Sequence, residues 1–270
     1  MDTLNSNFSL ESKKVVILGG SSGLGLATAK AAAAEGAHVI VVSSNAARVQ
    51  NAVLELQGNG FGMQADLSDE ASVKRLFEEI GTFDHLVFTA GENLLLGSIA
   101  ETEVGKARAF FNLRYWGAFT AVKYAAPRVN AGGSIVLTGG IASARPNAGW
   151  SVGASICAAM EGFTRAMAVE LAPVRVNLVS PGVVRTSLWS AMEETERDAF
   201  YDQIAGTLPV RHVGEAGQLA QTYLYLMKQP FVTGQILVTD GGAGARLITP
   251  RLLHAVLSHA RLQPLRRRSR

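Results

Sequence analysis

The sequence has little of what marks a secreted or membrane-spanning chain. Its single cysteine, Cys157, has no partner within the chain for a disulfide, and a lone thiol fits a reducing compartment. No stretch reaches the length of about 20 uninterrupted apolar residues that a membrane helix needs. Residues 1–14 are polar and contain no apolar segment typical of a secretory signal. We therefore expect a protein of the cytoplasm with no membrane partner.

Acidic residues are absent from residues 246–270, which contain seven arginines. Without these seven the chain has 18 Lys and Arg against 22 Asp and Glu, so residues 1–245 carry a formal net charge of −4. The pI near 9.1 is thus a property of the tail, and the body of the chain is not predicted to bind nucleic acid. A basic tail can contact phosphates or acidic lipids, but chain ends are often frayed, so we favour a flexible, solvated segment over residues 247–270.

Short apolar runs alternate with helical patterns along the rest of the chain. The runs that predict strands are 14–18, 38–42, 61–65, 84–89, 134–138, 175–179 and 235–238. The predicted helices are 23–35, 45–57, a helix capped by Ser68, 102–126, 151–172, 192–205 and 215–227. Most strands are continuously apolar, as in a parallel sheet covered on both faces. We predict one doubly wound α/β domain of the Rossmann type, with about seven strands, over residues 12–246, after an N-terminal extension at 1–11.

A glycine-rich turn follows the first predicted strand. Residues 19–25 read GGSSGLG, with glycines spaced GxxxGxG, and they lead directly into a helix. Glycines let a backbone approach a pyrophosphate closely, and the free N–H groups at the helix start bind its charge. A purely structural turn is the alternative. The position of the motif on the first strand–helix turn of an alternating α/β chain favours a dinucleotide site.

These motifs resemble those of the short-chain dehydrogenase/reductase family over about residues 12–245. The cofactor motif TGxxxGxG appears as LGGSSGLG at 18–25, and Thr89, Ala90 and Gly91 stand at the last three positions of the NNAG motif. PGxVxT is intact at 181–186, and GQxLxxDGG is intact at 235–242. The resemblance implies an NAD(P)-dependent oxidoreductase. The residues it assigns to the cofactor are Gly19, Ser21, Ser22, Gly23, Leu24, Gly25, Asp66, Leu67, Thr89, Ala90, Gly91, Pro181, Gly182, Val184 and Thr186.

The end of the second strand indicates which cofactor is preferred. An acidic residue at this position binds the ribose diol and repels a 2′-phosphate. The position is Ser43, followed by Ser44 and Asn45, with Arg48 one turn further on. Hydroxyl groups and a guanidinium can donate to a phosphate, and no carboxylate opposes them. A helix cap is the alternative role of the three polar residues. We predict that NADP(H) is preferred over NAD(H).

The family's catalytic residues are missing. The family uses Tyr-x-x-x-Lys on the helix after the fifth strand, with a serine thirteen residues before the tyrosine. Aligned through residues 158–162, the tyrosine position is Gly153, the lysine position is Cys157 and the serine position is Gly140, and no tyrosine occurs between Tyr124 and Tyr201. Where the family has an asparagine, this chain has Arg114. The resemblance therefore points to a divergent branch.

Few residues can replace the missing groups. Arg114 brings a permanent charge, and the nearest hydroxyls are those of Ser143, Ser151 and Ser155. We take Arg114 and Ser143 as the candidate catalytic residues. Serines act more often as caps, and a serine hydroxyl is a poorer acid than a tyrosine. Trp150 and Trp189 can line a substrate pocket or pack in the core. We assign no role to His212, and no metal-ligand spacing is present in the sequence.

Two functions remain open. The first is an NADP-dependent oxidoreductase that acts on a small-molecule carbonyl or alcohol with an altered proton donor. The second is a non-catalytic NADP(H)-binding protein that acts as a sensor or supports a partner. We also expect a homo-oligomer, a dimer or tetramer, formed through the helices at 102–126 and 151–172. The apolar residues we expect in that interface are Phe110, Ala118, Ala121, Ala159 and Phe163.

Overall fold

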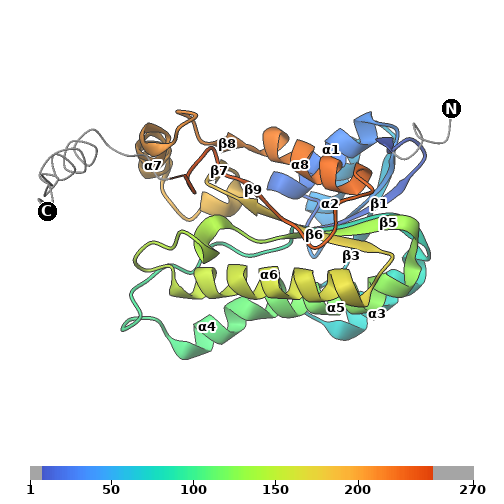
Figure 1. The fold of residues 1–270 in the computed structure, drawn as a ribbon, viewed down its shortest axis with the longest axis horizontal. Coiled ribbons are helices and arrows are strands. Elements are labelled where there is room, and N and C mark those ends of the chain that lie inside the picture. The colour runs from blue at the N-terminus through green and yellow to red at the C-terminus, as the bar shows by residue number, and fades with distance from the viewer. Residues whose placement is uncertain (1–7, 246–270) are drawn as a thin grey trace, which may run out of the picture.

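The structure, a computed structural model, describes residues 8–245 and contains one seven-stranded sheet (Figure 1). All of its neighbouring strands pair in parallel, in the order β3-β2-β1-β4-β5-β6-β9. The strands are β1 (Lys14–Leu18), β2 (His38–Ser43), β3 (Gly60–Gln64), β4 (Phe83–Phe88), β5 (Val129–Thr138), β6 (Arg175–Pro181) and β9 (Ile236–Thr239). The predicted doubly wound parallel sheet is confirmed.

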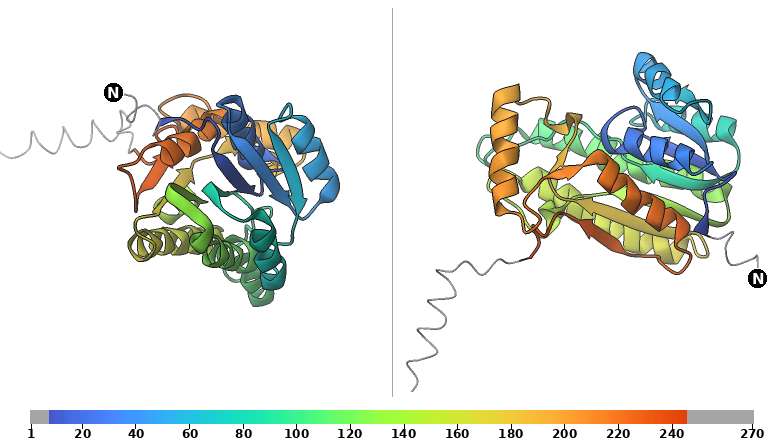
Figure 2. Two further views of the ribbon diagram at one scale, coloured as in Figure 1. Left: turned by 90° about the vertical axis from the view of Figure 1, so that its right-hand side faces the viewer. Right: turned by 90° about the horizontal axis from the view of Figure 1, so that it is seen from above.

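Helices cover both faces of this sheet, and the side chains of β1 show why. Val15 and Ile17 pack into a core with the helices α1 and α8, whereas Val16 and Leu18 pack into a second core with α3, α5 and α6. Because alternate side chains of a strand point to opposite faces, a strand buried on both faces must be apolar throughout. The helices are α1 (Gly23–Ala34), α2 (Ala46–Leu54), α3 (Glu70–Ile80), α4 (Val104–Phe111), α5 (Ala118–Ala125), α6 (Ser151–Glu170), α7 (Glu194–Thr207) and α8 (Ala216–Lys228). In Figure 2, left, the green and yellow helices α4 to α6 lie together on one side of the sheet.

Several local expectations are corrected. The helix expected at 102–126 is interrupted by the π-helical segment η2 (Asn112–Gly117) between α4 and α5. Asp69, not Ser68, caps α3, because its carboxylate accepts from the N–H groups of Ala71 and Ser72. The sixth strand continues through Pro181 instead of ending at Val179, and a short pair, β7 (Val184–Arg185) with β8 (Gly214–Glu215), was not predicted.

Of the two predicted end segments, only the N-terminal one falls partly within residues 8–245. Leu10, which we placed in an N-terminal extension, is fully buried in the core with α1 and α8, so packing of the domain begins before residue 12. The predicted tail at 247–270 lies outside the described residues. The first three strands extend the sheet from β1 toward β3, and β4 then pairs on the opposite side of β1. The direction in which strands are added therefore reverses between β1 and β4. In sheets of this kind ligands bind at the carboxyl ends of the strands beside that reversal.

Candidate active site

The glycine turn between β1 and α1 is shaped for close approach of a ligand. Gly19 has a φ of +85°, and a Cβ there would lie 2.5 Å from the backbone nitrogen of Ala90, so the turn packs directly on the end of β4. Gly23 has a φ of +51°, yet the nearest atom to a Cβ would be Cβ of Thr186 at 3.5 Å. Packing excludes a side chain at Gly19, whereas a Cβ on Gly23 would only be in ordinary van der Waals contact with Thr186. Ser22 begins α1 without a side-chain cap, so its hydroxyl does not block the first N–H groups of the helix.

A single large cleft begins at this turn. Its volume is about 740 Å³, and it follows the carboxyl ends of β1, β2, β4, β5 and β6. Of the 19 residues predicted for the cofactor, 17 line it, all except Gly25 and Asn45. Gly25 faces inward, where a Cβ would lie 2.5 Å from the Thr89 hydroxyl oxygen. The Asn45 side chain accepts from the N–H of Arg48, so Asn45 caps α2. The structure thus brings 17 of the predicted cofactor residues together, whereas Gly25 is buried behind the cleft and Asn45 is exposed outside it.

One end of the cleft is polar. Ser43, Ser44, Arg48 and Asp66 line it there. The hydroxyl and the backbone N–H of Ser68 donate to the Asp66 carboxylate at 2.6 and 2.9 Å, and these bonds hold the pKa of Asp66 below its usual range. Within residues 8–245, no carboxylate forms an ion pair with Arg48. Arg48 is therefore available to a phosphate.

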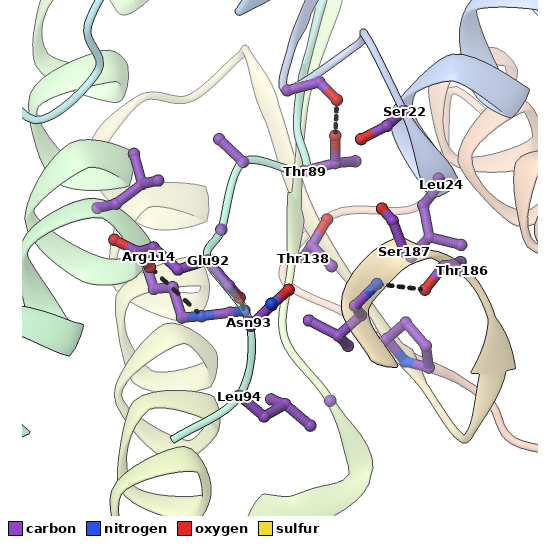
Figure 3. A pocket seen from close by; sticks show the side chains of 18 of the residues that line it. Ser22, Leu24, Thr89, Glu92, Asn93, Leu94, Arg114, Thr138, Thr186 and Ser187 are labelled. Carbon is purple, nitrogen blue, oxygen red and sulfur yellow. Dashed lines mark hydrogen bonds and ion pairs between the residues drawn. The ribbon is translucent and has the colours of Figure 1, made fainter. Parts of the chain in front are cut away.

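The later motifs support the walls of the cleft. The Thr89 hydroxyl lies 3.1 Å from the carbonyl oxygen of Leu18 and 3.3 Å from that of Gly19, which ties the end of β4 to the glycine turn (Figure 3 shows the contact with the turn). The Asp240 carboxylate accepts from the N–H groups of Gly242 and Gly244, and a Cβ on Gly182 would lie 2.8 Å from Cα of Asp240. The GQxLxxDGG motif therefore holds the PGxVxT loop in place from behind.

Arg114 lies in the cleft, on the π-helical segment η2. Its side chain is 22% exposed, and its guanidinium carbon is 4.9 Å from the centre of the Phe110 ring. Nη2 donates to the carbonyl oxygen of Glu92, and Nε lies 3.8 Å from the Glu92 carboxylate without a hydrogen-bond partner. Burial lowers the pKa of Arg114 while Glu92 raises it, but an arginine stays protonated in proteins. Figure 3 shows Arg114 and Glu92 across the cavity from Thr186 and Ser187.

The three positions that the resemblance aligns with the family's tyrosine, lysine and serine all border the cleft. Gly153 and Cys157 lie one turn apart on α6, and Gly140 follows β5; all three line the cleft. Burial raises the pKa of the Cys157 thiol to about 11, although the charge of Arg114 lowers it. Cys157 is therefore a neutral thiol near pH 7 and offers neither a positive charge nor a thiolate nucleophile.

Ser143 does not line the cleft. Its hydroxyl donates to the Glu161 carboxylate at 2.5 Å and to the carbonyl oxygen of Gly140 at 3.3 Å, so the group we weighed as a catalyst faces away from the cavity. Ser155 is likewise engaged, with the carbonyl oxygen of Ser151. His212 bonds to the Val213 carbonyl oxygen outside the cleft. The side chains of Ser143, Ser155 and His212 thus bond to other groups of the fold, and we assign them no role in the cleft.

Sequence reasoning missed part of the lining. Trp150 and Trp189, for which we left two roles open, both border the cleft. The lining residues that we did not assign include Glu92, Asn93, Leu94, Leu96, Thr138, Ile141, Ala142, Ile156, Leu188 and Ser190. Position alone could have indicated Thr138, since it is the last residue of β5. The loop residues 92–96 carry no motif that marks them.

The fold and the cleft define a dinucleotide-binding α/β protein, and comparison with known proteins identifies its class. A family model described as enoyl-(acyl carrier protein) reductase matches residues 19–244. The chain belongs to the short-chain dehydrogenase/reductase family of oxidoreductases. No group of three His, Cys, Asp or Glu side chains suited to a metal ion occurs in residues 8–245. No helix in that part of the chain is long and apolar enough to cross a membrane.

The similar proteins are reductases and dehydrogenases over nearly their whole length. Carbonyl reductase family member 4 of Danio rerio is 35% identical over 242 residues, which are 86% of this chain and 98% of that protein. The 3-oxoacyl-(acyl-carrier-protein) reductase of Homo sapiens is 30% identical over 238 residues, or 85% and 97% of the two chains. A solved small-chain dehydrogenase in complex with NADPH is 38% identical, with a TM-score of 0.76 over 87% of this chain and 100% of its own.

Proposed function

We propose that this protein is an NADP(H)-dependent oxidoreductase that acts on a carbonyl or alcohol substrate without the usual tyrosine and lysine. The observation that carries the proposal is the continuity of one cleft from the glycine turn, through the motifs of the family, to Arg114 and Cys157. The site fits a dinucleotide, because Gly23 lines the cleft with a positive φ and its nearest neighbour, Thr186, comes no closer than ordinary van der Waals contact. The NADPH complex of a 38% identical dehydrogenase supports the same cofactor class.

The preference for NADP(H) is supported by charge at the polar end. Ser43 stands at the end of β2, where a carboxylate would repel a 2′-phosphate, and Arg48 lies beside it in the lining. Gln64 donates to the carbonyl oxygen of Ser44 at 2.9 Å, which fixes the backbone of this turn. At the end of β2 a phosphate gains an arginine and meets no carboxylate from residues 43–45, and the one acid at the polar end, Asp66, comes from the segment after β3.

When bound, the nicotinamide supplies or accepts the hydride. The Arg114 guanidinium holds the substrate oxygen and stabilises negative charge that develops there, because it is charged and only 22% exposed. It cannot act as a general acid at working pH. Ser143 points away, and burial makes the Cys157 thiol a weak acid by raising its pKa to about 11, so we assign the proton to water or to the substrate itself. Unactivated ketones are therefore expected to react slowly.

The test combines a cofactor titration with a turnover screen. NADPH and NADH are titrated against the protein, and NADPH oxidation is followed over a set of carbonyl compounds. Gly23→Leu should abolish NADPH binding because its side chain projects into the cleft. Gly58→Leu is the matched control, since Gly58 also has a positive φ, +91°, with no atom within 4 Å of a Cβ and no place in the cleft. Binding of NADPH without turnover would favour the non-catalytic NADP(H)-binding protein, and binding of neither nucleotide would refute the proposal.

A homo-oligomer is also proposed, with a changed interface. Phe110, Ala118, Ala121 and Phe163, which we expected at the interface, are buried in the core of the protein itself. Trp116 and Phe119 instead present apolar surface on η2 and α5, where they are 52% and 41% exposed. The centres of these two aromatic rings lie 5.8 Å apart, and the pair supports an interface along η2 and α5. The free thiol of Cys157 supports a reducing compartment such as the cytoplasm.

A further inference from the structure

The substrate end of the cleft contains an open recess at Gly153. This residue lies near the start of α6 and lines the cleft, yet no atom outside its own stretch of helix lies within 4 Å of the position a Cβ would take. A side chain of any size at this position would extend into the cavity. Gly139 and Gly140, after β5, also line the cleft. Bare backbone therefore forms much of this wall, and a ligand can approach it closely.

The remaining surface of the recess is apolar. Trp150 precedes α6, and Ile141, Ala142 and Ile156 complete the same side. Cys157 adds a sulfur whose thiol stays neutral near pH 7. A wall of this kind offers a polar substrate group no hydrogen-bond partner, so a polar group bound there would lose its water without replacement.

Leucine and tryptophan side chains from two other segments line the same end of the cleft. Leu94 and Leu96 come from the loop after β4, and Leu188 and Trp189 come from the segment after β7. Two polar groups that border this end are already engaged. The indole N–H of Trp189 donates to the Val184 carbonyl oxygen, and the Thr138 hydroxyl bonds both to the Phe88 carbonyl oxygen and to the Tyr223 hydroxyl. Neither requires a partner from a ligand, whereas Asn93, Ser187 and Ser190, from the same two segments, add polar side chains to the lining.

The ion pair of Arg114 and Glu92 stands at the border of this apolar space. Arg114 packs on Gly91 and interacts electrostatically with Cys157, which follows Gly153 by one turn of α6. Its Nε atom has no hydrogen-bond partner among residues 8–245. A ligand that fits both features has one oxygen at the guanidinium and an extended apolar body in the recess.

We propose that the substrate is a flat, multi-ring apolar ketone or the corresponding alcohol, and that Gly153 is the residue that determines this specificity. The proposal rests on the proposed oxidoreductase function. Bare glycine backbone admits the face of a ring system, Trp150 provides aromatic surface, and the ketone oxygen reaches Arg114. The position at which the family has its tyrosine becomes binding surface in this chain.

The test fills the recess and measures binding apart from turnover. Gly153→Leu is compared with Gly162→Leu, because both glycines lie on α6 with no neighbour within 4 Å of a Cβ, and Gly162 does not line the cleft. Both changes remove a helix glycine, so their effects on stability should match. The probes are 9-fluorenone as the flat ketone and cyclohexanone as the small one. Binding is measured with NADP⁺ present by quenching of tryptophan fluorescence and by equilibrium dialysis.

In wild type, 9-fluorenone is expected to bind more tightly than cyclohexanone. Gly153→Leu should weaken the binding of 9-fluorenone by about tenfold or more and should change the affinities for cyclohexanone and NADPH little. Gly162→Leu should change none of the three affinities. The proposal would be overturned if Gly153→Leu weakened the binding of both ketones equally, weakened the binding of NADPH or had no effect. It would also be overturned if wild type did not bind 9-fluorenone. Selective binding of 9-fluorenone without NADPH oxidation would support the recess and refute the oxidoreductase function, so the two failures are distinguishable.

Discussion

The sulfur of Cys157 lies 3.2 Å from the point at which a Cβ on Gly140 would stand. This is tighter than ordinary van der Waals contact, so the two residues fit together only because position 140 has no side chain. Gly140 has an extended backbone, with φ at 179°, which any residue can adopt. The contact with Cys157, rather than backbone strain, therefore decides what position 140 accepts.

Gly140→Ser should consequently depend on residue 157. The single change is expected to lower the free energy of unfolding by about 1 kcal/mol, because the new side chain displaces the sulfur. The double variant Gly140→Ser/Cys157→Ala should recover most of that loss. Urea unfolding of both single variants and the double variant forms a complete cycle. Strictly additive effects would show that the two side chains do not compete for the same space.

Arg114→Ala should abolish most of the activity. Loss of the charge that holds the substrate oxygen is expected to lower kcat/KM by about 100-fold, and Arg114→Lys should retain part of the activity. Steady-state kinetics are measured beside NADPH affinity and melting temperature, which separate a catalytic effect from unfolding. The control is Arg108→Ala, an exposed arginine on α4. Ser143→Ala should change kcat/KM little, because its hydroxyl bonds to Glu161. Unchanged kinetics in the Arg114 variants would leave the cleft without a catalytic candidate.

Cofactor choice should change with the residues at the end of β2. Arg48→Ala is expected to weaken NADPH by about tenfold and to leave NADH nearly unchanged, since only NADPH carries the 2′-phosphate. Ser43→Asp should shift the ratio of affinities further toward NADH, because its carboxylate repels the 2′-phosphate of NADPH and accepts hydrogen bonds from the ribose diol of NADH. Fluorescence titrations with both nucleotides give the ratio of dissociation constants. Arg75→Ala, an exposed arginine on α3 away from the cleft, is the control. Tighter binding of NADH by wild type would contradict the argument.

Stability should fall on mild acidification because of His85. This side chain is 5% exposed, lies 2.9 Å from the Ser134 hydroxyl, and has its pKa lowered to about 4 by burial and by the charge of Arg175. The unfolded state takes up a proton at His85 near pH 6.5, whereas the folded state does not. The contribution of His85 to the free energy of unfolding is therefore present above pH 6.5 and is lost as the pH falls toward 4. Between pH 7 and 5 the loss is about 2 kcal/mol. His85→Gln should remove this part of the pH dependence in urea unfolding, whereas His38→Gln, at an exposed position, should retain it.

Oligomerisation should depend on the exposed aromatic pair. Trp116→Ser with Phe119→Ser is expected to convert a dimer or tetramer into monomers, because both side chains offer apolar surface on η2 and α5. Light scattering at micromolar concentration gives the mass. Phe231→Ser is the control, since this 97% exposed side chain lies elsewhere. A monomeric wild type, or an unchanged oligomer in the double variant, would contradict the proposal.

The order of elements could be predicted from the sequence because it depends on local patterns. Strands buried on both faces must be apolar at consecutive positions, and Val15 to Leu18 meet this condition. The glycine turn could be recognised for the same reason, because a tight approach to a ligand requires residues without side chains at fixed spacing. Boundaries were less certain. Asp69 rather than Ser68 caps α3, since the two candidates are adjacent and only the path of the chain selects between them.

Only the tertiary structure decided what surrounds the chemistry. The π-helical segment η2 carries Arg114, and its extra residue per turn changes the direction in which nearby side chains point. No pattern in the sequence indicates this change. The contact between Gly140 and Cys157, the engagement of Ser143 with Glu161 and the recess at Gly153 join the end of β5 to α6. The loop after β4 and the segment after β7 provide further walls from distant parts of the chain. Local periodicity fixes which residues are buried, but a cavity is formed by whichever side chains the crossovers bring together, and that depends on the packing of the whole domain.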